Sequence, residues 1–535
     1  MTSKVLDLFV DGTETDVLLI QPSCLFREGF IEKEVHDYFN AASKIGESVG
    51  DSPEEANYGL LSIATNLADN GMAVQILDLN SIDFRLREQG QILSIDLVDA
   101  ILKKFVARIY GISYMTSTYG MWEEPIYRSI RSRANSANTP IVYGGIHPSV
   151  CWRDILRERR DKNLYVMVGE GDIEFPEFCS MLLGRKHKRT DFRGIANCSL
   201  QIEKQIVTLE DLRQNCFPNY NLVPPYAKNN VRRFYLTRGC TGGCLFCSVS
   251  SFHASRGGKY YRELDRGDRS IFQSHISNIV TEYQKGMKIV MGDLTFFEID
   301  WYFKEFCEEL VMETQRRGVK PEWWCQTRAD CVTPQMAAIL REAGCTQVAI
   351  GCESANNRIL RALRKNITVD EWKRALYLVK QNDMKAQAYI ILGSGFEDGA
   401  SIENTIETVV SLIDRDLIDL VHLSVLVPYP GTALYNAPEA NGIVIVDHDY
   451  RNYWMNCDLY GYGMPVYRTI SESGKIILES HEIYSYWKLA MGEVSKAYLR
   501  KHRRSINIVK ENHDVLFTYK GCNGELFGKL YMHRQ

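Results

Sequence analysis

Short apolar runs alternate with helix-length segments over most of the 535 residues, in two series. In the first series, each run is separated from the next by enough chain for a helix, as parallel strands require. This alternation predicts an α/β chain that starts with an open, doubly wound parallel sheet. Such a sheet has its ligand crevice beyond the carboxyl ends of the strands. The runs are DVLLIQPS (16–23), MAVQILDLN (72–80), ARIYGISY (107–114), TPIVYGG (139–145) and NLYVMVGEG (163–171).

The second series starts at Arg232 and has six runs with nearly continuous apolar residues. Strands of this kind are typical of parallel sheets buried on both faces. Six β/α units are fewer than the eight that close a full barrel, so we expect a partial (β/α)6 barrel of the TIM type, with its active site at the strands' carboxyl ends. The runs are RRFYLTRG (232–239), MKIVMGDLTF (287–296), EWWCQTRAD (322–330), QVAIGCES (347–354), MKAQAYIILG (384–393) and VHLSVLVPYP (421–430).

The remaining segments complete a predicted four-part organisation. We expect a Rossmann-like N-terminal domain over residues 1–184, interrupted by an insertion at 24–57, and a connector over 185–231. The partial barrel follows over 232–440. Residues 441–535 are expected to form a small, mostly helical domain that caps the barrel mouth.

Composition narrows the function classes. The chain is 45% hydrophobic and 24% charged, with a net charge of -4, which is typical of a globular protein and disfavours strong binding to nucleic acid or anionic membranes. No stretch offers eighteen consecutive apolar residues, so we expect a cytoplasmic protein that binds no membrane. In a reducing compartment the fifteen cysteines should be free thiols, metal ligands or catalytic groups.

Three of these cysteines stand within eight residues, directly after the first strand of the predicted barrel. Cys240, Cys244 and Cys247 have the spacing C-x3-C-x2-C, and glycines at 242 and 243 let the loop turn its N–H groups toward sulfur. Three protein ligands leave one metal position open, as catalysis requires, whereas structural sites are normally closed by a fourth ligand. The alternative is a structural zinc site with His253 as the fourth ligand.

The motif C-x3-C-x-F-C in this position resembles the radical S-adenosylmethionine (SAM) superfamily. In that family three cysteines hold a [4Fe-4S] cluster whose remaining iron chelates SAM, and one electron cleaves SAM to a 5'-deoxyadenosyl radical. Four later segments resemble the family's SAM-binding motifs: GDLTFF, TRAD, GCES and ILGSGFED. The last departs from G-x-P-G-E, because Ser394 replaces proline and Phe396 precedes Glu397. The SAM contacts implied by the resemblance are Phe246, Asp293, Arg328, Glu353, Ser354 and Gly393.

The first 180 residues resemble the cobalamin (B12)-binding domain that precedes the barrel in one branch of this superfamily. LLIQPS, YGLLSIA, GISYMTSTYG, VYGGIHPS and VGEGDIEF follow the order of its strand-end and helix-start motifs. The histidine motif D-x-H-x-x-G is missing, so we expect cobalamin to bind without a protein histidine below cobalt; a domain without its cofactor is the alternative. The implied cobalamin contacts are Ser113, Thr116, Gly144, Gly145, His147, Gly169, Glu170 and Gly171.

These resemblances imply a cobalamin-dependent radical SAM enzyme. We expect a C-methyltransferase that acts on an unactivated carbon of a small molecule: one SAM supplies the methyl group through cobalamin, and a second supplies the radical that removes a hydrogen atom. An electron donor such as flavodoxin or ferredoxin is implied. The alternatives are a radical SAM lyase, dehydratase, epimerase or cyclase without methyl transfer, and a cobalamin or redox sensor.

Overall fold

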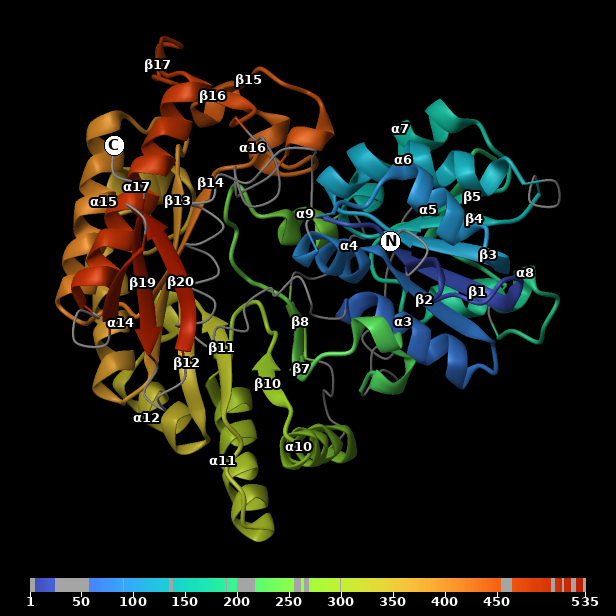
Figure 1. The fold of residues 1–535 in the computed structure, drawn as a ribbon, viewed down its shortest axis with the longest axis horizontal. Helices are drawn as coiled ribbons and strands as arrows, with labels where there is room; N and C mark the ends of the chain where they lie inside the picture. Colours follow the sequence, from blue (N-terminus) through green and yellow to red (C-terminus); the bar gives the residue numbers. More distant parts are fainter. Residues whose placement is uncertain are drawn as a thin grey trace.

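Two parallel sheets lie side by side in the computed structural model, with the first strands of the second half between them (Figure 1). The structure describes residues 5–24, 57–89, 91–133, 138–188, 190–199, 217–254, 261–263, 269–298, 300–453, 464–501, 506–511, 514–520 and 526–532. Most of the expected insertion at 24–57 therefore lies outside the described residues. Within the described part of the chain, no helix is both long and apolar enough to cross a bilayer.

The N-terminal sheet has the strand order β2-β1-β3-β4-β5-β6, and its first five strands are parallel. The predicted doubly wound sheet is thus confirmed, with its switch point between β1 and β3. Residues 17–20 of β1 are all buried, since helices cover both faces. The elements are β1 (Thr13–Gln21), α3 (Tyr58–Asp69), β2 (Val74–Asp78), α4 (Leu79–Glu88), α5 (Ile95–Leu102), β3 (Phe105–Ser113), α6 (Thr116–Arg131), β4 (Ile141–Gly144), α7 (Ile146–Arg159), β5 (Leu164–Met167), α8 (Glu174–Leu182) and the antiparallel edge strand β6 (Ile195–Asn197).

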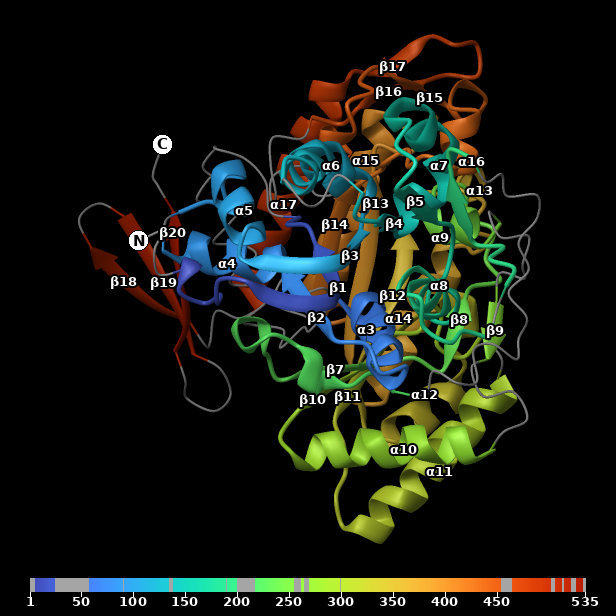
Figure 2. The same cartoon turned by 90° about the vertical axis from the view of Figure 1, so that its right-hand side faces the viewer.

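The second sheet has the order β14-β13-β12-β11-β10-β7 and is parallel throughout. It confirms the predicted partial barrel of six strands. Figure 2 views the molecule from the side of the N-terminal sheet, with the barrel strands behind it. The elements are β7 (Val231–Phe234), β8 (Thr237–Gly239), α9 (Ser248–Ala254), β9 (Tyr261–Glu263), α10 (Arg269–Gln284), β10 (Lys288–Met291), α11 (Asp300–Arg317), β11 (Trp323–Thr327), α12 (Pro334–Glu342), β12 (Cys345–Glu353), α13 (Asn357–Ala362), α14 (Val369–Gln381), β13 (Lys385–Leu392), α15 (Gly399–Asp414), β14 (Leu420–Val425) and α16 (Ala433–Asn436).

The first barrel strand differs from the single run expected from the sequence. It divides into β7, which pairs with β10, and β8, which pairs antiparallel with β9. The buried carboxylate of Asp293 accepts hydrogen bonds from the backbone N–H groups of Leu236 and Thr237, at 3.0 and 2.7 Å. These N–H groups are thereby withdrawn from the β7–β10 ladder, and the chain turns out of the sheet just before the three cysteines.

The C-terminal segment contains more strands than expected. An antiparallel sheet, a helix packed against α15 and a second antiparallel sheet follow one another, whereas a mostly helical domain was predicted. The strands of the first sheet have only three or four residues, too few to show a clear alternation. The elements are β15 (Ile443–Ile445), the 3-10 turn η6 (Tyr450–Asn452), β16 (Tyr467–Ile470), β17 (Ile476–Leu478), α17 (Ser480–Lys501), β18 (Ile506–Glu511), β19 (Asp514–Lys520) and β20 (Leu526–Met532).

The turn after β13 packs against the C-terminal segment so closely that only glycine fits at position 395. A Cβ on Gly395 would lie 1.8 Å from the carbonyl oxygen of Asn441. We expect Gly395→Ala to lower the free energy of unfolding by about 1–3 kcal/mol, as overpacking typically does. Thermal unfolding checks this. Gly492→Ala on the exposed face of α17 is the control, since nothing lies within 4 Å of its Cβ position. Equal melting temperatures for Gly395→Ala and the wild type would contradict the prediction.

Candidate active site

The three-cysteine loop follows β8 and is fixed to the barrel on two sides. The N–H of Leu245 donates to the carbonyl of Leu363 at 2.9 Å, and its own carbonyl accepts from the N–H of Leu434 at 3.2 Å. None of the three cysteines is in a disulfide, and each residue is only partly buried. Backbone contacts therefore hold the loop in place without enclosing its cysteines completely.

The surroundings of Cys240 fit an iron-sulfur cluster. Its Sγ accepts the N–H of Gly242 at 3.2 Å and lies 3.3 Å from Oγ1 of Thr295. A Cβ on Gly242 would lie 3.0 Å from Nη1 of Arg328 and 3.2 Å from Sγ of Cys240, so a side chain would crowd this cradle. Hydrogen bonds to sulfur stabilise cluster thiolates and tune the reduction potential.

The alternative to a cluster is the structural zinc site predicted from the sequence. Among the described side chains, no three His, Cys, Asp or Glu groups are arranged to hold one metal ion. The side chain of His253, the fourth ligand of that alternative, lies outside the described residues, so the zinc site stays a prediction.

Two cations stand beside the cysteine loop. Arg328 holds Asp330 in a two-point contact and donates to the carbonyl of Lys365 at 3.1 Å. Nζ of Lys365 in turn donates to Oε1 of Glu353 at 2.7 Å, and the two side chains are only 9% and 6% exposed. Glu353 has φ of +61°, a backbone conformation that is unusual outside glycine and often marks functional sites.

Lys365 was not predicted from the sequence. It lies in a tight turn after α13, between Arg364 and Asn366, which both have positive φ. In the sequence, a lysine between an arginine and an asparagine looks like the end of any exposed helix. Only its position twelve residues after Glu353 could have suggested a pair, and sequence spacing alone does not specify that contact.

Besides Arg328 and Glu353, three further implied SAM contacts have structural partners in the fold. Asp293 binds the backbone before β8, and burial raises its pKa to about 6. Ser354 is fully buried and accepts the N–H of Asn356 at 3.2 Å. A Cβ on Gly393 would lie 2.5 Å from Cγ2 of Ile483, so this glycine lies directly under α17. Phe246 is partly buried against the barrel core. Contact of these residues with SAM stays a prediction.

The implied cobalamin contacts on β3 and β4 lie together at one edge of the sheet. Ser113 pairs with Gly144, and the N–H of Tyr114 donates to the carbonyl of Gly144 at 2.8 Å. Gly145 has φ of +97°, and a Cβ there would lie 2.5 Å from the carbonyl oxygen of Tyr114. Gly145 thus packs against the end of β3, beside the switch point where doubly wound sheets bind cofactors.

The loop after β5 brings the other implied cobalamin contacts to the same edge. The N–H of Gly169 donates to Oγ of Ser149 on α7 at 2.8 Å, and Gly169 has positive φ. Glu170 is buried, and a Cβ added to Gly171 would contact Met167 at 3.3 Å. These contacts hold the loop against the edge of the sheet, and contact of its residues with cobalamin stays a prediction.

His147 is enclosed by other side chains. It is fully buried, with its ring centroid 4.4 Å from that of Tyr119 and 4.8 Å from that of Tyr450, and Nδ1 lies 3.4 Å from Oγ1 of Thr116. Burial lowers its pKa to about 3, so the imidazole is neutral.

We therefore expect cobalamin to bind without His147 as a ligand to cobalt. The electron paramagnetic resonance spectrum of the cob(II)alamin form should show no nitrogen splitting from a protein ligand, and His147→Ala should leave that spectrum unchanged. Nitrogen splitting that disappears in His147→Ala would contradict this prediction.

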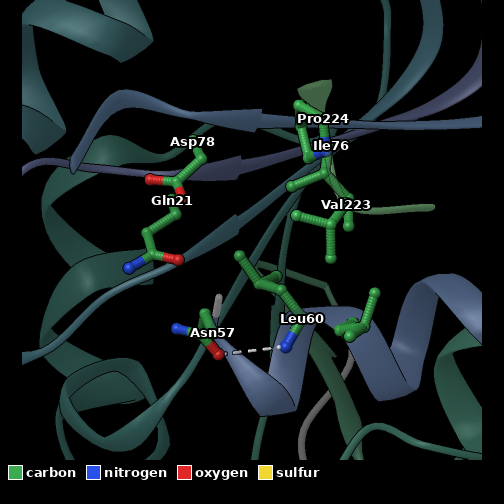
Figure 3. A pocket seen from close by; sticks show the side chains of 8 residues that line it. Gln21, Asn57, Leu60, Ile76, Asp78, Val223 and Pro224 are labelled. Carbon is green, nitrogen blue, oxygen red and sulfur yellow. Dashed lines mark hydrogen bonds between the residues drawn. The ribbon is translucent and has the colours of Figure 1, made fainter. Parts of the chain in front are cut away.

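A small hollow lies near the carboxyl ends of β1 and β2 (Figure 3). Asn57 accepts the N–H of Leu60 at its floor, and Val223 and Pro224 lie across it. The hollow lies on the β2 side of β1, away from the β1/β3 switch point where doubly wound sheets bind cofactors.

Comparisons with known proteins agree with the division of the chain into an N-terminal doubly wound sheet and a partial barrel. Residues 234–409 match the Radical SAM superfamily, and residues 52–179 match the B12 binding domain. The "Uncharacterized methyltransferase PH0819" of Pyrococcus horikoshii is 26% identical over 355 residues, which are 64% of this chain and 72% of that protein. The anaerobic magnesium-protoporphyrin IX monomethyl ester cyclase of Rubrivivax gelatinosus is 26% identical over 201 residues, 37% of this chain and 33% of the cyclase.

A solved structure shares the fold. The radical S-adenosylmethionine methyltransferase TsrM from Kitasatospora setae, with cobalamin and a [4Fe-4S] cluster bound, superposes with a TM-score of 0.57 and 14% identity. The superposition covers 91% of this chain and 89% of TsrM. Both matched domains, their order and the two observed sheets agree. The chain therefore carries a radical SAM domain over residues 234–409, preceded by a B12-binding domain over residues 52–179.

Proposed function

We propose that this protein is a cobalamin-dependent radical SAM methyltransferase that adds a methyl group to an unactivated carbon of a small molecule. The observation that carries the proposal is that a three-cysteine loop and the small-residue edge of a B12-binding sheet occur in one chain. The name of the Pyrococcus horikoshii relative supports methyl transfer. When bound, SAM and the cluster supply the radical that opens a C–H bond, and cobalamin supplies methyl transfer.

The residues near the loop have distinct proposed roles. Cys240, Cys244 and Cys247 hold the cluster and leave one iron position open for SAM. Arg328 binds the SAM carboxylate, as its motif implies, through Nη1 beside Gly242, while its Nε and Nη2 hold Asp330. Lys365 fixes Glu353 for a contact with the amino group or ribose of SAM.

We place the substrate against the sheet face that the helices leave uncovered. On the inner strands β11 and β13 and on the edge strand β14 most side chains are buried, but Gln326, Tyr389 and His422 are partly exposed. Tyr389 and His422 are opposite each other in register, and their ring centroids are 5.4 Å apart. Partly exposed residues on otherwise buried strands support a face that is open to a ligand, because alternate residues point to opposite faces.

A second candidate is a radical SAM cyclase without methyl transfer, which the match to the Rubrivivax gelatinosus cyclase favours. That match covers only about a third of either chain. Both candidates use the same cysteine loop, so only the fate of the methyl group separates them. In either case we expect reduction by a partner such as flavodoxin or ferredoxin.

The test uses the full chain, reconstituted without oxygen with iron, sulfide and cobalamin. A pool of small metabolites is added with reductant and with SAM that carries a labelled methyl group. We expect one compound to acquire the label and to make 5'-deoxyadenosine formation depend on its presence. Substrate-dependent 5'-deoxyadenosine without label transfer would support the cyclase class instead. No reductive cleavage of SAM at all would sink both candidates.

A further inference from the structure

Arg238 joins the cysteine loop to the N-terminal domain. It lies on β8, two residues before Cys240, and its side chain is only 19% exposed. Nη2 donates to Oδ1 of Asp172 at 3.5 Å, and Asp172 belongs to the loop between β5 and α8, directly after the implied cobalamin contact Gly171. One arginine thus touches the segments proposed to hold the two cofactors.

The guanidinium is held by more than this ion pair. Its central carbon lies 5.8 Å from the ring centroids of both Tyr58 on α3 and Tyr235 before β8, and the two rings are 4.5 Å apart. Cations within about 6 Å of aromatic rings are attracted to them. A planar, weakly hydrated guanidinium suits this place beside two rings better than the compact ammonium of lysine.

Asp172, which accepts the hydrogen bond from Arg238, is also held in place. Oδ1 of Asp172 accepts the hydroxyl of Ser62 on α3 at 2.6 Å, and the Asp172 side chain is 7% exposed. Glu170 adds a second negative charge near Arg238. A buried ion pair is weak evidence for stability, because desolvation offsets the attraction, but it can specify one arrangement of the parts that it joins.

We infer that Arg238 is a positioning residue that sets the distance between the cysteine loop and the B12-binding edge, so that radical formation and methyl transfer act on one substrate. The inference deepens the proposed function and rests on it. Since a displacement of about 1 Å can lower a reaction rate about 100-fold, losing this contact should separate the two half-reactions. SAM cleavage would continue, but fewer cleavage events would yield methylated product.

The first test measures methylated product formed per 5'-deoxyadenosine in the reconstituted enzyme. Arg238→Gln should keep its cluster and SAM cleavage, while the ratio falls at least about tenfold, given the sensitivity to displacement noted above. Arg238→Lys should lower the ratio of methylated product to 5'-deoxyadenosine less than Arg238→Gln does. The control is Arg157→Gln, whose partner Asp154 is exposed and in the same domain. An unchanged ratio, or a parallel loss of both products, would overturn the inference.

The second test needs no turnover and therefore does not depend on the proposed reaction. Amide hydrogen exchange is compared in the wild type, Arg238→Gln and Asp172→Asn. We expect faster exchange in both variants at two separate segments, residues 237–247 and α3, and no change in Arg157→Gln. Unchanged exchange in both segments would overturn the inference even if methylation is confirmed. If Arg238→Gln does not fold, Asp172→Asn decides, because it changes the contact from the other domain.

Discussion

Replacing Cys240, Cys244 and Cys247 together with alanine is expected to remove the iron-sulfur cluster and all reductive cleavage of SAM. The wild type should bind about four iron and four sulfide per chain after anaerobic reconstitution, as a [4Fe-4S] centre requires. The variant should bind almost none, because the three thiols are the proposed protein ligands of the cluster. Iron and sulfide analysis and 5'-deoxyadenosine formation measure both effects.

The matched control for the cysteine variant is Cys198→Ala, which changes an exposed thiol outside the site. It should retain the full iron content and activity of the wild type. A full complement of iron in the triple variant would place the cluster elsewhere in the chain. The assignment of the cysteine loop would then be wrong, whatever the activity.

Replacing Lys365 with methionine is expected to cause the largest loss of stability among single substitutions at the site. The change leaves the carboxylate of Glu353 buried without its cation, and breaking a buried pair in this way typically costs about 3–5 kcal/mol. The attraction to Glu353 and to Cys244 raises the pKa of Lys365 despite its burial, which by itself would lower it. A lower melting temperature and weaker SAM cleavage should appear together.

Two further variants separate the effect of the Lys365–Glu353 ion pair from general effects of substitution on stability. In Lys365→Met/Glu353→Gln no uncompensated charge remains, so much of the stability should return while SAM cleavage stays low. Arg157→Met breaks an exposed pair and should change stability by less than about 1 kcal/mol. If Lys365→Met melts like the wild type, the ion pair does not support the site.

The arrangement of the two sheets could be predicted from the sequence because parallel strands buried on both faces appear as continuous apolar runs. The runs at 16–23 and 347–354, for example, became β1 and β12 with little shift. The break between β7 and β8 could not be predicted. It depends on the carboxylate of Asp293, which binds the backbone of residues 57 and 56 positions earlier in the chain.

Part of the candidate site could also be predicted from the sequence, and part could not. The cysteines have a local spacing, so their loop could be located from sequence alone. Lys365 and Arg238 act through contacts with residues in other elements, Glu353 and Asp172, and neither contact leaves a local pattern. For Asp293, Ser354 and Gly393 the motif was visible, but their structural contacts with backbone and α17 were not.

The central claim is that radical formation and methyl transfer occur in one turnover, and the amounts of the products test it most directly. The reconstituted wild type is given its substrate and SAM without oxygen, and S-adenosylhomocysteine, 5'-deoxyadenosine and methylated product are quantified in the same reaction. The proposed function predicts near-equal amounts of all three. Formation of 5'-deoxyadenosine and a changed substrate without S-adenosylhomocysteine would contradict methyl transfer, while leaving the radical SAM assignment intact.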